Sequence, residues 1–103
     1  MPQTLKVAQT SDLAPGQGKT VDVEGQSIAL FNVDGTFYAI DNTCTHEGGP
    51  LGEGELNGVI VTCPWHAAEF NVKTGDVTDP PADEGVRSFP VKVEGDDVLV
   101  ELN

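Results

Sequence analysis

The chain has 103 residues, which is enough for one domain with one modest hydrophobic core. Apolar residues make up 38% of it and charged residues 21%, values that are typical of a globular protein and exclude a disordered chain. The 17 acidic side chains outnumber the 5 basic ones and give a net charge of −12, which argues against nucleic-acid or anionic-membrane binding and favours a basic protein partner.

Short runs rich in Val, Ile, Phe and Tyr follow one another along the chain, separated by turns that contain Gly, and helical periodicity is nearly absent. This pattern predicts an all-β fold. The expected strands, in chain order, are residues 5–8, 19–23, 27–33, 36–41, 59–62, 69–71, 86–94 and 97–102.

Turn signals separate several of these runs. Asp34 and Gly35 stand between two apolar runs and predict a tight hairpin, because Gly tolerates the positive φ of such a turn. Gly95, between residues 86–94 and 97–102, predicts a second hairpin, and the pair Asn57-Gly58 predicts a turn.

Nothing in the sequence suggests a membrane anchor or an export signal. The longest apolar runs have about four residues, as in residues 28–31, against the roughly 20 that a membrane helix needs. Residues 1–4 show no basic stretch leading into an apolar segment. We therefore expect a soluble cytoplasmic protein.

All the cysteines and histidines of the chain lie between positions 44 and 66. They form two pairs, Cys44 with His46 and Cys63 with His66, and each pair follows a predicted strand. Such clustering of ligand-type residues predicts a site rather than a chance distribution.

Three chemistries compete for these four residues. A disulfide between Cys44 and Cys63 is disfavoured, because structural disulfides are rare in a reducing compartment. A structural zinc site is possible, although one residue between Cys44 and His46 is a tighter spacing than zinc knuckles use. The favoured interpretation is a binuclear iron–sulfur cluster with two thiolates on one iron and two imidazoles on the other.

The motifs resemble the two cluster-binding boxes of Rieske proteins. The family pattern is C-x-H, about 15 to 17 residues, then C-x-x-H, and the matching segments here are Cys44-Thr45-His46-Glu47-Gly48-Gly49-Pro50-Leu51 and Cys63-Pro64-Trp65-His66. The likeness continues in residues 70–75 and 89–96 and covers nearly the full length. It is most similar to the small Rieske-type ferredoxins that supply electrons to ring-hydroxylating oxygenases.

The resemblance implies a single Rieske domain over residues 1–103. Its antiparallel β base would comprise residues 1–42 and 82–103, with a cluster-binding subdomain inserted at about 43–81. One [2Fe–2S] cluster per chain would be bound by Cys44, His46, Cys63 and His66. Residues 79–82 would form the proline loop that shields the cluster, and Trp65 would help to cover it.

Two departures from the respiratory and photosynthetic Rieske proteins predict a low reduction potential. Gly49 and Trp65 stand where those proteins carry an extra pair of cysteines, so no such disulfide forms here. Ala68 and Phe70 stand where they carry Ser and Tyr hydroxyls that donate to sulfur. Without these donors we expect a potential of about −150 to 0 mV. Phe70 is expected to be a core residue instead.

The implied function is one-electron transfer from a flavin-containing NAD(P)H reductase to a terminal oxygenase. The chain itself is expected to be a carrier and not an enzyme, because mononuclear iron oxygenases need two further histidines and a carboxylate. We expect a monomer that docks on a basic surface of its partner, with Glu47 as the docking candidate. The alternatives are the small Rieske-like subunit of an assimilatory nitrite reductase and, in another class, a zinc-stabilised interaction module.

Overall fold

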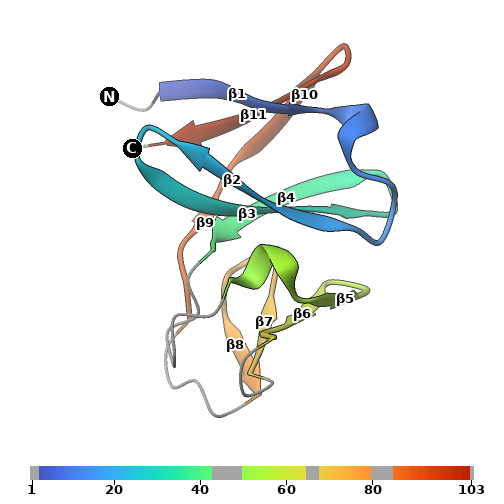
Figure 1. Ribbon diagram of the computed structural model, residues 1–103, viewed down its shortest axis with the longest axis vertical. Helices are drawn as coiled ribbons and strands as arrows, with labels where there is room; N and C mark the ends of the chain where they lie inside the picture. Colours follow the sequence, from blue (N-terminus) through green and yellow to red (C-terminus); the bar gives the residue numbers. More distant parts are fainter. Residues whose placement is uncertain (1–2, 43–49, 65–67, 80–84, 103) are drawn as a thin grey trace.

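Three antiparallel sheets make up the part of the chain that the computed structural model describes, residues 3–42, 50–64, 68–79 and 85–102 (Figure 1). In the first sheet the order is β1 (Gln3–Gln9), β11 (Asp97–Leu102), β10 (Val91–Glu94). The second sheet has the order β2 (Gly18–Val23), β3 (Gln26–Val33), β4 (Thr36–Asp41), β9 (Ser88–Phe89). In the third the order is β5 (Glu55–Asn57), β6 (Ile60–Thr62), β7 (Glu69–Asn71), β8 (Val77–Asp79).

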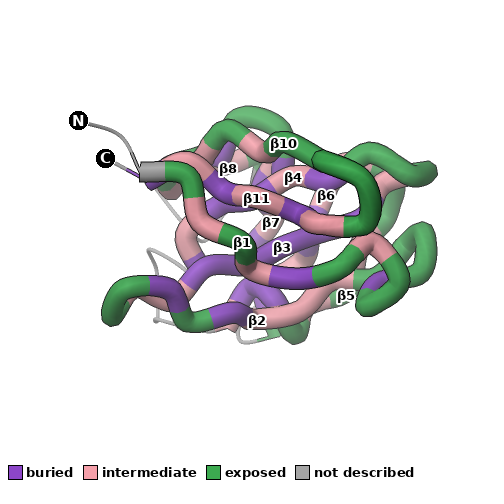
Figure 2. Tube along the Cα trace, turned by 90° about the horizontal axis from the view of Figure 1, so that it is seen from above, coloured by how far each residue is buried: buried purple, intermediate pink, exposed green. Residues whose placement is uncertain are grey.

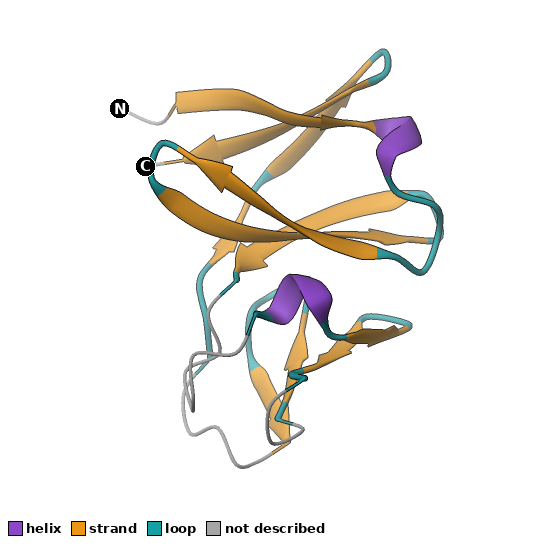
Figure 3. Cartoon of the chain, in the orientation of Figure 1, coloured by secondary structure: helices purple, strands orange, loops and turns teal. Residues whose placement is uncertain are grey.

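Helical structure is limited, in these ranges, to two short 3₁₀ segments, η1 (Thr10–Asp12) and η2 (Leu51–Glu53) (Figure 3). The predicted all-β fold is therefore confirmed. No helix of the described residues is long and apolar enough to cross a membrane.

The second sheet lies between the other two (Figure 1). Its strand β3 is buried on both faces. Ile28 and Leu30 belong to the cluster shared with the first sheet, whereas Ala29 and Phe31 belong to the cluster shared with the third sheet. Each of the four side chains is fully buried. A strand covered on both faces needs a continuous apolar run, which explains residues 28–31.

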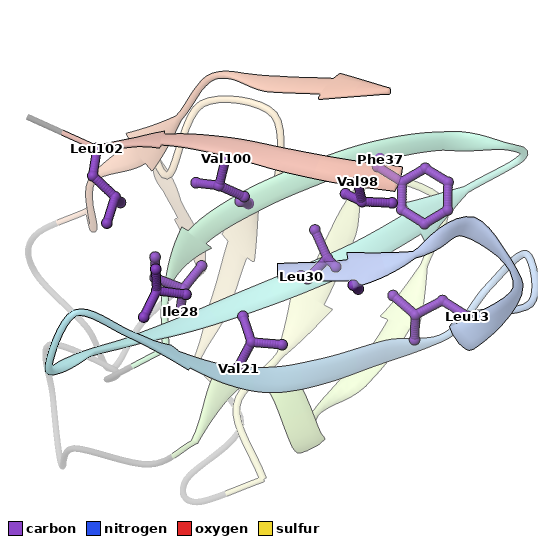
Figure 4. Packing of buried hydrophobic residues seen from close by; sticks show 11 residues of the cluster. Leu13, Val21, Ile28, Leu30, Phe37, Val98, Val100 and Leu102 are labelled. Atoms are coloured by element: carbon purple, nitrogen blue, oxygen red, sulfur yellow. The ribbon is translucent and has the colours of Figure 1, made fainter. Parts of the chain in front are cut away.

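The first cluster packs the first sheet against the second (Figure 4). Its buried members are Ala8, Leu13, Val21, Val23, Ile28, Leu30, Phe37, Ala39, Val98, Val100 and Leu102. The second cluster packs the second sheet against η2 and the third sheet, and its buried members are Ala29, Phe31, Ile40, Leu51, Val61, Cys63, Ala68, Phe70 and Val72. In the view from above, exposed residues occupy the turns that join the strands and most of the edge strand β10 (Figure 2).

The predicted hairpins are confirmed. Asp34 and Gly35 have φ of 51° and 92°, the two positive values of the turn that best matches strand twist, and β3 and β4 pair as far as Val33 with Thr36. The pairing of Glu94 with Asp97 places Gly95 in the turn from β10 to β11. A further hairpin, which the sequence reading missed, joins β2 to β3 through Glu24 and Gly25, again with positive φ at both residues.

One strand prediction needs correction, and two short strands were not predicted. The expected strand over residues 86–94 is two strands, because Pro90 has no N–H and separates β9 in the second sheet from β10 in the first. The short edge strands β5 and β8 were not predicted. Each is three residues long with one apolar residue, too short for an alternating pattern to be visible.

Candidate metal centre

Of the four predicted ligands, the structure describes Cys63. Cys44, His46 and His66 lie outside the described residues, as do Glu47, Trp65 and residues 80–82 of the expected proline loop. Among the described residues no three His, Cys, Asp or Glu side chains gather as a metal site. The geometry available is therefore that of Cys63 and of the residues flanking each predicted loop.

Cys63 directly follows β6 and is 2% exposed, in the same apolar cluster as Leu51 and Ala68. Its backbone N–H donates to the carbonyl oxygen of Ala68 at 2.7 Å. That bond closes the segment 64–67 at its base, just before β7 begins. An apolar, solvent-excluding surround and a fixed backbone suit a thiolate that binds a metal, so Cys63 fits the predicted centre.

The segment 43–50, which carries Cys44 and His46, is closed by a different pair of bonds. The Leu51 N–H donates to the Asn42 carbonyl oxygen at 2.7 Å, and the Gly52 N–H donates to Asn42 Oδ1 at 2.7 Å. Leu51 is fully buried in the cluster that holds Cys63. The bases of the two predicted ligand loops therefore meet in one apolar cluster beneath the second sheet.

A third set of contacts anchors the chain where it returns after residue 84. The Val86 N–H donates to the Gly75 carbonyl oxygen at 2.7 Å. The Arg87 guanidinium donates from Nε to Asp41 Oδ2 and from Nη2 to Asp41 Oδ1, both at 3.0 Å, and the Arg87 backbone N–H also donates to Asp41 Oδ2 at 3.0 Å. The Asp41 N–H in turn donates to the Arg87 carbonyl oxygen at 2.9 Å.

Arg87 is the single arginine of the chain. The side-chain hydrogen bond to Asp41 and the charge of Asp41 raise the pKa of Arg87, with a small opposing contribution from burial. The guanidinium therefore stays charged at neutral and alkaline pH. The stabilisation from this raised pKa is lost only as the pH rises through it, far above the physiological range.

Acidic side chains line the outer face of the third sheet beside Cys63. Thr62 pairs with Glu55 on one side and with Glu69 on the other, so these three residues form one cross-strand row. Val61 and Phe70 face the buried cluster, which places the row on the opposite face. The sequence reading missed this row, because only strand pairing brings Glu55 and Glu69 together.

Phe70 is fully buried, which confirms it as a core residue, and Ala68 is also fully buried. Ala68 and Phe70 carry no hydroxyl, so neither side chain is a hydrogen-bond donor. Among the described residues, the side chains of the buried cluster that contains Cys63 are thus apolar, and the acidic row lies on the opposite face of the sheet.

Comparison with known proteins gives a family match. The Rieske [2Fe-2S] domain model matches residues 3–90. The biphenyl dioxygenase ferredoxin subunit of Pseudomonas sp. strain KKS102 is 39% identical over 99 residues, which cover 95% of this chain and 91% of that protein.

Solved structures agree in fold. The ferredoxin of carbazole 1,9a-dioxygenase from Nocardioides aromaticivorans IC177 superposes with a TM-score of 0.91 at 32% identity, covering 95% of this chain and 96% of that one. A chain in the complex of reduced oxygenase and oxidised ferredoxin of carbazole 1,9a-dioxygenase gives 0.89 at 38% identity, covering 94% and 91%. A protein assigned as an NADPH nitrite reductase small subunit is less similar, with a TM-score of 0.78 at 26% identity over 95% and 97% of the two chains.

Proposed function

The chain belongs to the Rieske [2Fe-2S] domain family, and on that basis we propose that it is a one-electron carrier of a ring-hydroxylating oxygenase system. The observation that carries the proposal is the similarity, over nearly the whole of both chains, to proteins named as dioxygenase ferredoxin subunits. These relatives are carriers by name, which supports a role as a carrier rather than as an enzyme.

The proposed ligands are Cys44, His46, Cys63 and His66, holding one Rieske-type [2Fe–2S] cluster per chain. Bound there, the cluster supplies reversible uptake of one electron, and its imidazole ligands make reduction easier than in a cluster with four thiolates. The protein's contribution is to fix the ligand loops at their bases and to exclude water around Cys63. The buried position of Cys63 and the closed loop base at Ala68 support this assignment.

The division of the chain into a base, residues 1–42 and 82–103, and an inserted cluster-binding subdomain, about 43–81, is part of the proposal. It is supported by strand composition, because the first two sheets take their strands from both ends of the chain and the third sheet takes its strands from the middle.

For partners, we propose a flavoprotein reductase as the electron donor and a terminal oxygenase as the acceptor. The complex of oxygenase and ferredoxin among the similar structures supports the acceptor. We propose that the carrier is a monomer and docks on a basic surface, with the acidic row of Glu55 and Glu69 at the edge of the contact. The net charge of −12 supports an electrostatically steered encounter of this kind.

The nitrite reductase alternative is weaker in sequence: two nitrite reductase small subunits are 26% and 23% identical to this chain, whereas the two carbazole dioxygenase ferredoxins are 32% and 38% identical. Fold does not separate the two, because one of these small subunits superposes with a TM-score of 0.90. The zinc alternative has no support in the comparisons, where the matching family model is that of an iron–sulfur domain.

The testing experiment measures iron and acid-labile sulfide in the purified protein and follows its visible absorbance on reduction with dithionite. We expect about two irons and two sulfides per chain and a reversible loss of colour. Zinc without sulfide would contradict the cofactor. Reduction without electron delivery to any ring-hydroxylating oxygenase, together with delivery to a nitrite reductase, would contradict the proposed system.

A further inference from the structure

We propose that Asn42 is a positioning residue for the metal centre: it closes the loop that carries Cys44 and His46 and ties this loop to the second sheet. The inference rests on the proposed function, because it assumes that the two residues are cluster ligands. It concerns a residue that the sequence motifs did not single out.

The side chain of Asn42 uses both of its polar atoms. Its Oδ1 accepts hydrogen bonds from the Gly52 N–H at 2.7 Å and from Thr20 Oγ1 at 3.0 Å, and its Nδ2 donates to Ser27 Oγ at 3.2 Å. The orientation of the amide is fixed, because a backbone N–H can only donate, so the atom opposite Gly52 must be the oxygen.

The backbone of Asn42 is engaged in the same way. Its N–H donates to the Ser27 carbonyl oxygen at 3.1 Å, and its carbonyl oxygen accepts from the Leu51 N–H at 2.7 Å. One residue therefore joins β2, β3 and η2 at the point where the predicted ligand loop leaves β4. Both ends of the segment 43–50 are held by it.

The approach of η2 to β2 is unusually close, and Gly52 permits it. A Cβ on Gly52 would lie 2.5 Å from Thr20 Oγ1 and 2.8 Å from the Thr20 nitrogen, distances that real side chains do not adopt. With no side chain at position 52, the Gly52 N–H reaches Asn42 Oδ1. The loop base is thus built by two residues, an acceptor at 42 and a glycine at 52.

The hydrogen bonds of Asn42 matter because they set the position of one predicted ligand pair relative to the other. Leu51, held by Asn42, is buried in the same cluster as Cys63. Without the Oδ1 acceptor, the buried Gly52 N–H would lose its partner, and the loop ends would separate more easily. The cost of leaving a buried N–H without its partner corresponds to opening of the loop base that is about 10- to 100-fold more frequent.

A matched control is present in the same sheet. Asn32 and Asn42 are the two buried polar residues of the described chain, 4% and 7% exposed. Asn32 also closes a loop: its Nδ2 donates to the Leu13 carbonyl oxygen at 2.9 Å, and its Oδ1 accepts from the Gly35 N–H at 2.7 Å. It lies by the hairpin at the start of β4, whereas Asn42 follows the end of that strand.

The test compares Asn42→Ala, Asn42→Asp and Asn32→Ala with the wild type as purified holoproteins. The readouts are the rate of iron release to a chelator, the electron paramagnetic resonance spectrum of the reduced protein, and thermal unfolding by far-ultraviolet circular dichroism. We expect Asn42→Ala to broaden the spectrum and, because the loop base opens more often, to release iron about 10- to 100-fold faster. Asn32→Ala should lower thermal stability similarly but leave the spectrum and the release rate close to wild type.

Asn42→Asp keeps the Oδ1 acceptor, and the Ser27 hydroxyl is able to donate to the second carboxylate oxygen. This variant adds a buried negative charge, so it should not match the wild type, but because the acceptor is kept its release rate and line width should lie closer to wild type than those of Asn42→Ala. If Asn42→Ala and Asn32→Ala have equal effects on iron release and line width, the positioning role is wrong. If the wild type itself holds no iron–sulfur cluster, the proposed function fails first, and the two failures are distinguishable.

Discussion

The paired contacts of Asp41 and Arg87 allow a quantitative test of how the chain is anchored after residue 84. The perturbation is Asp41→Asn and Arg87→Gln, separately and together. Each removes a charge; Asn has nearly the shape of Asp, whereas Gln is shorter than Arg and also loses the contact of the guanidinium with Phe89. At 3.0 Å in water the Coulomb energy of the pair is about 1.4 kcal/mol. The Arg87 side chain is 69% exposed, so ordering and salt reduce this to a coupling of about 0.5–1 kcal/mol.

The assay is hydrogen–deuterium exchange of the peptides that contain residues 38–42 and 85–89, measured on the oxidised holoprotein so that no unfolding is required. A loss of 0.5–1 kcal/mol from local opening corresponds to exchange about two- to fivefold faster. The loss of free energy of local opening in the double variant should be smaller than the sum of the losses in the two single variants, and the difference is the coupling energy between Asp41 and Arg87. At about 1 M salt the coupling should shrink, because the Debye length falls to about 3 Å.

Equal exchange in the wild type, the two single variants and the double variant at low salt would show that the paired contacts between Asp41 and Arg87 do not anchor residues 85–89. A coupling that is unchanged by salt would show that the contact is held by hydrogen bonding alone and would refute the electrostatic part of the reasoning.

Three further outcomes are expected. The wild-type reduction potential is expected to lie in the range of about −150 to 0 mV, and Ala68→Ser, which places a hydroxyl in the buried surround of Cys63, should raise it if the hydroxyl donates to sulfur. A wild-type potential above about +200 mV in protein-film voltammetry would contradict the donor argument. Phe31→Ala leaves a cavity between the second and third sheets and should destabilise the protein by about 3–5 kcal/mol in thermal unfolding, whereas Phe31→Leu should be much milder, and equal effects would contradict the assigned packing. Glu55→Lys should slow electron delivery to the oxygenase about two- to threefold at low salt. Glu94→Lys, on β10 in the first sheet, should leave the rate unchanged, and stopped-flow rates that are equal for the two variants or indifferent to salt would argue against docking by the acidic row.

Most of the fold was predictable because turns and apolar runs are local signals. Residues 36–41 were predicted with their true bounds, since Asp34 and Gly35 mark the turn before them. β5 and β8 were missed because edge strands of three residues need a neighbouring strand to define them. Pro90 was visible in the sequence, but its effect, a change from one sheet to another, depends on the packing of the sheets.

Some residues of the candidate site could likewise be identified from the sequence, and others could not. The spacing of Cys44, His46, Cys63 and His66 is legible in the sequence because the family's chemistry requires it. Asn42 was not identifiable, because its partners Thr20, Ser27 and Gly52 are far from one another along the chain and meet only in the folded sheet. The acidic row depends on strand pairing for the same reason.

The double burial of β3 has a consequence for how the strand finds its alignment. When one face of a strand is exposed to solvent, a shift of the pairing register by one residue would expose its apolar side chains. Residues 28–31 are apolar on both faces, so hydrophobicity alone does not forbid such a shift of β3. The pairing register of β3 must therefore be set by the two hairpins at its ends. Glu24 with Gly25 and Asp34 with Gly35 each adopt two successive positive φ angles, which fix the number of residues in each loop and hence the partners of every residue in β3. Four residues on the surface thereby decide which apolar side chains support the metal centre and which support the outer sheet.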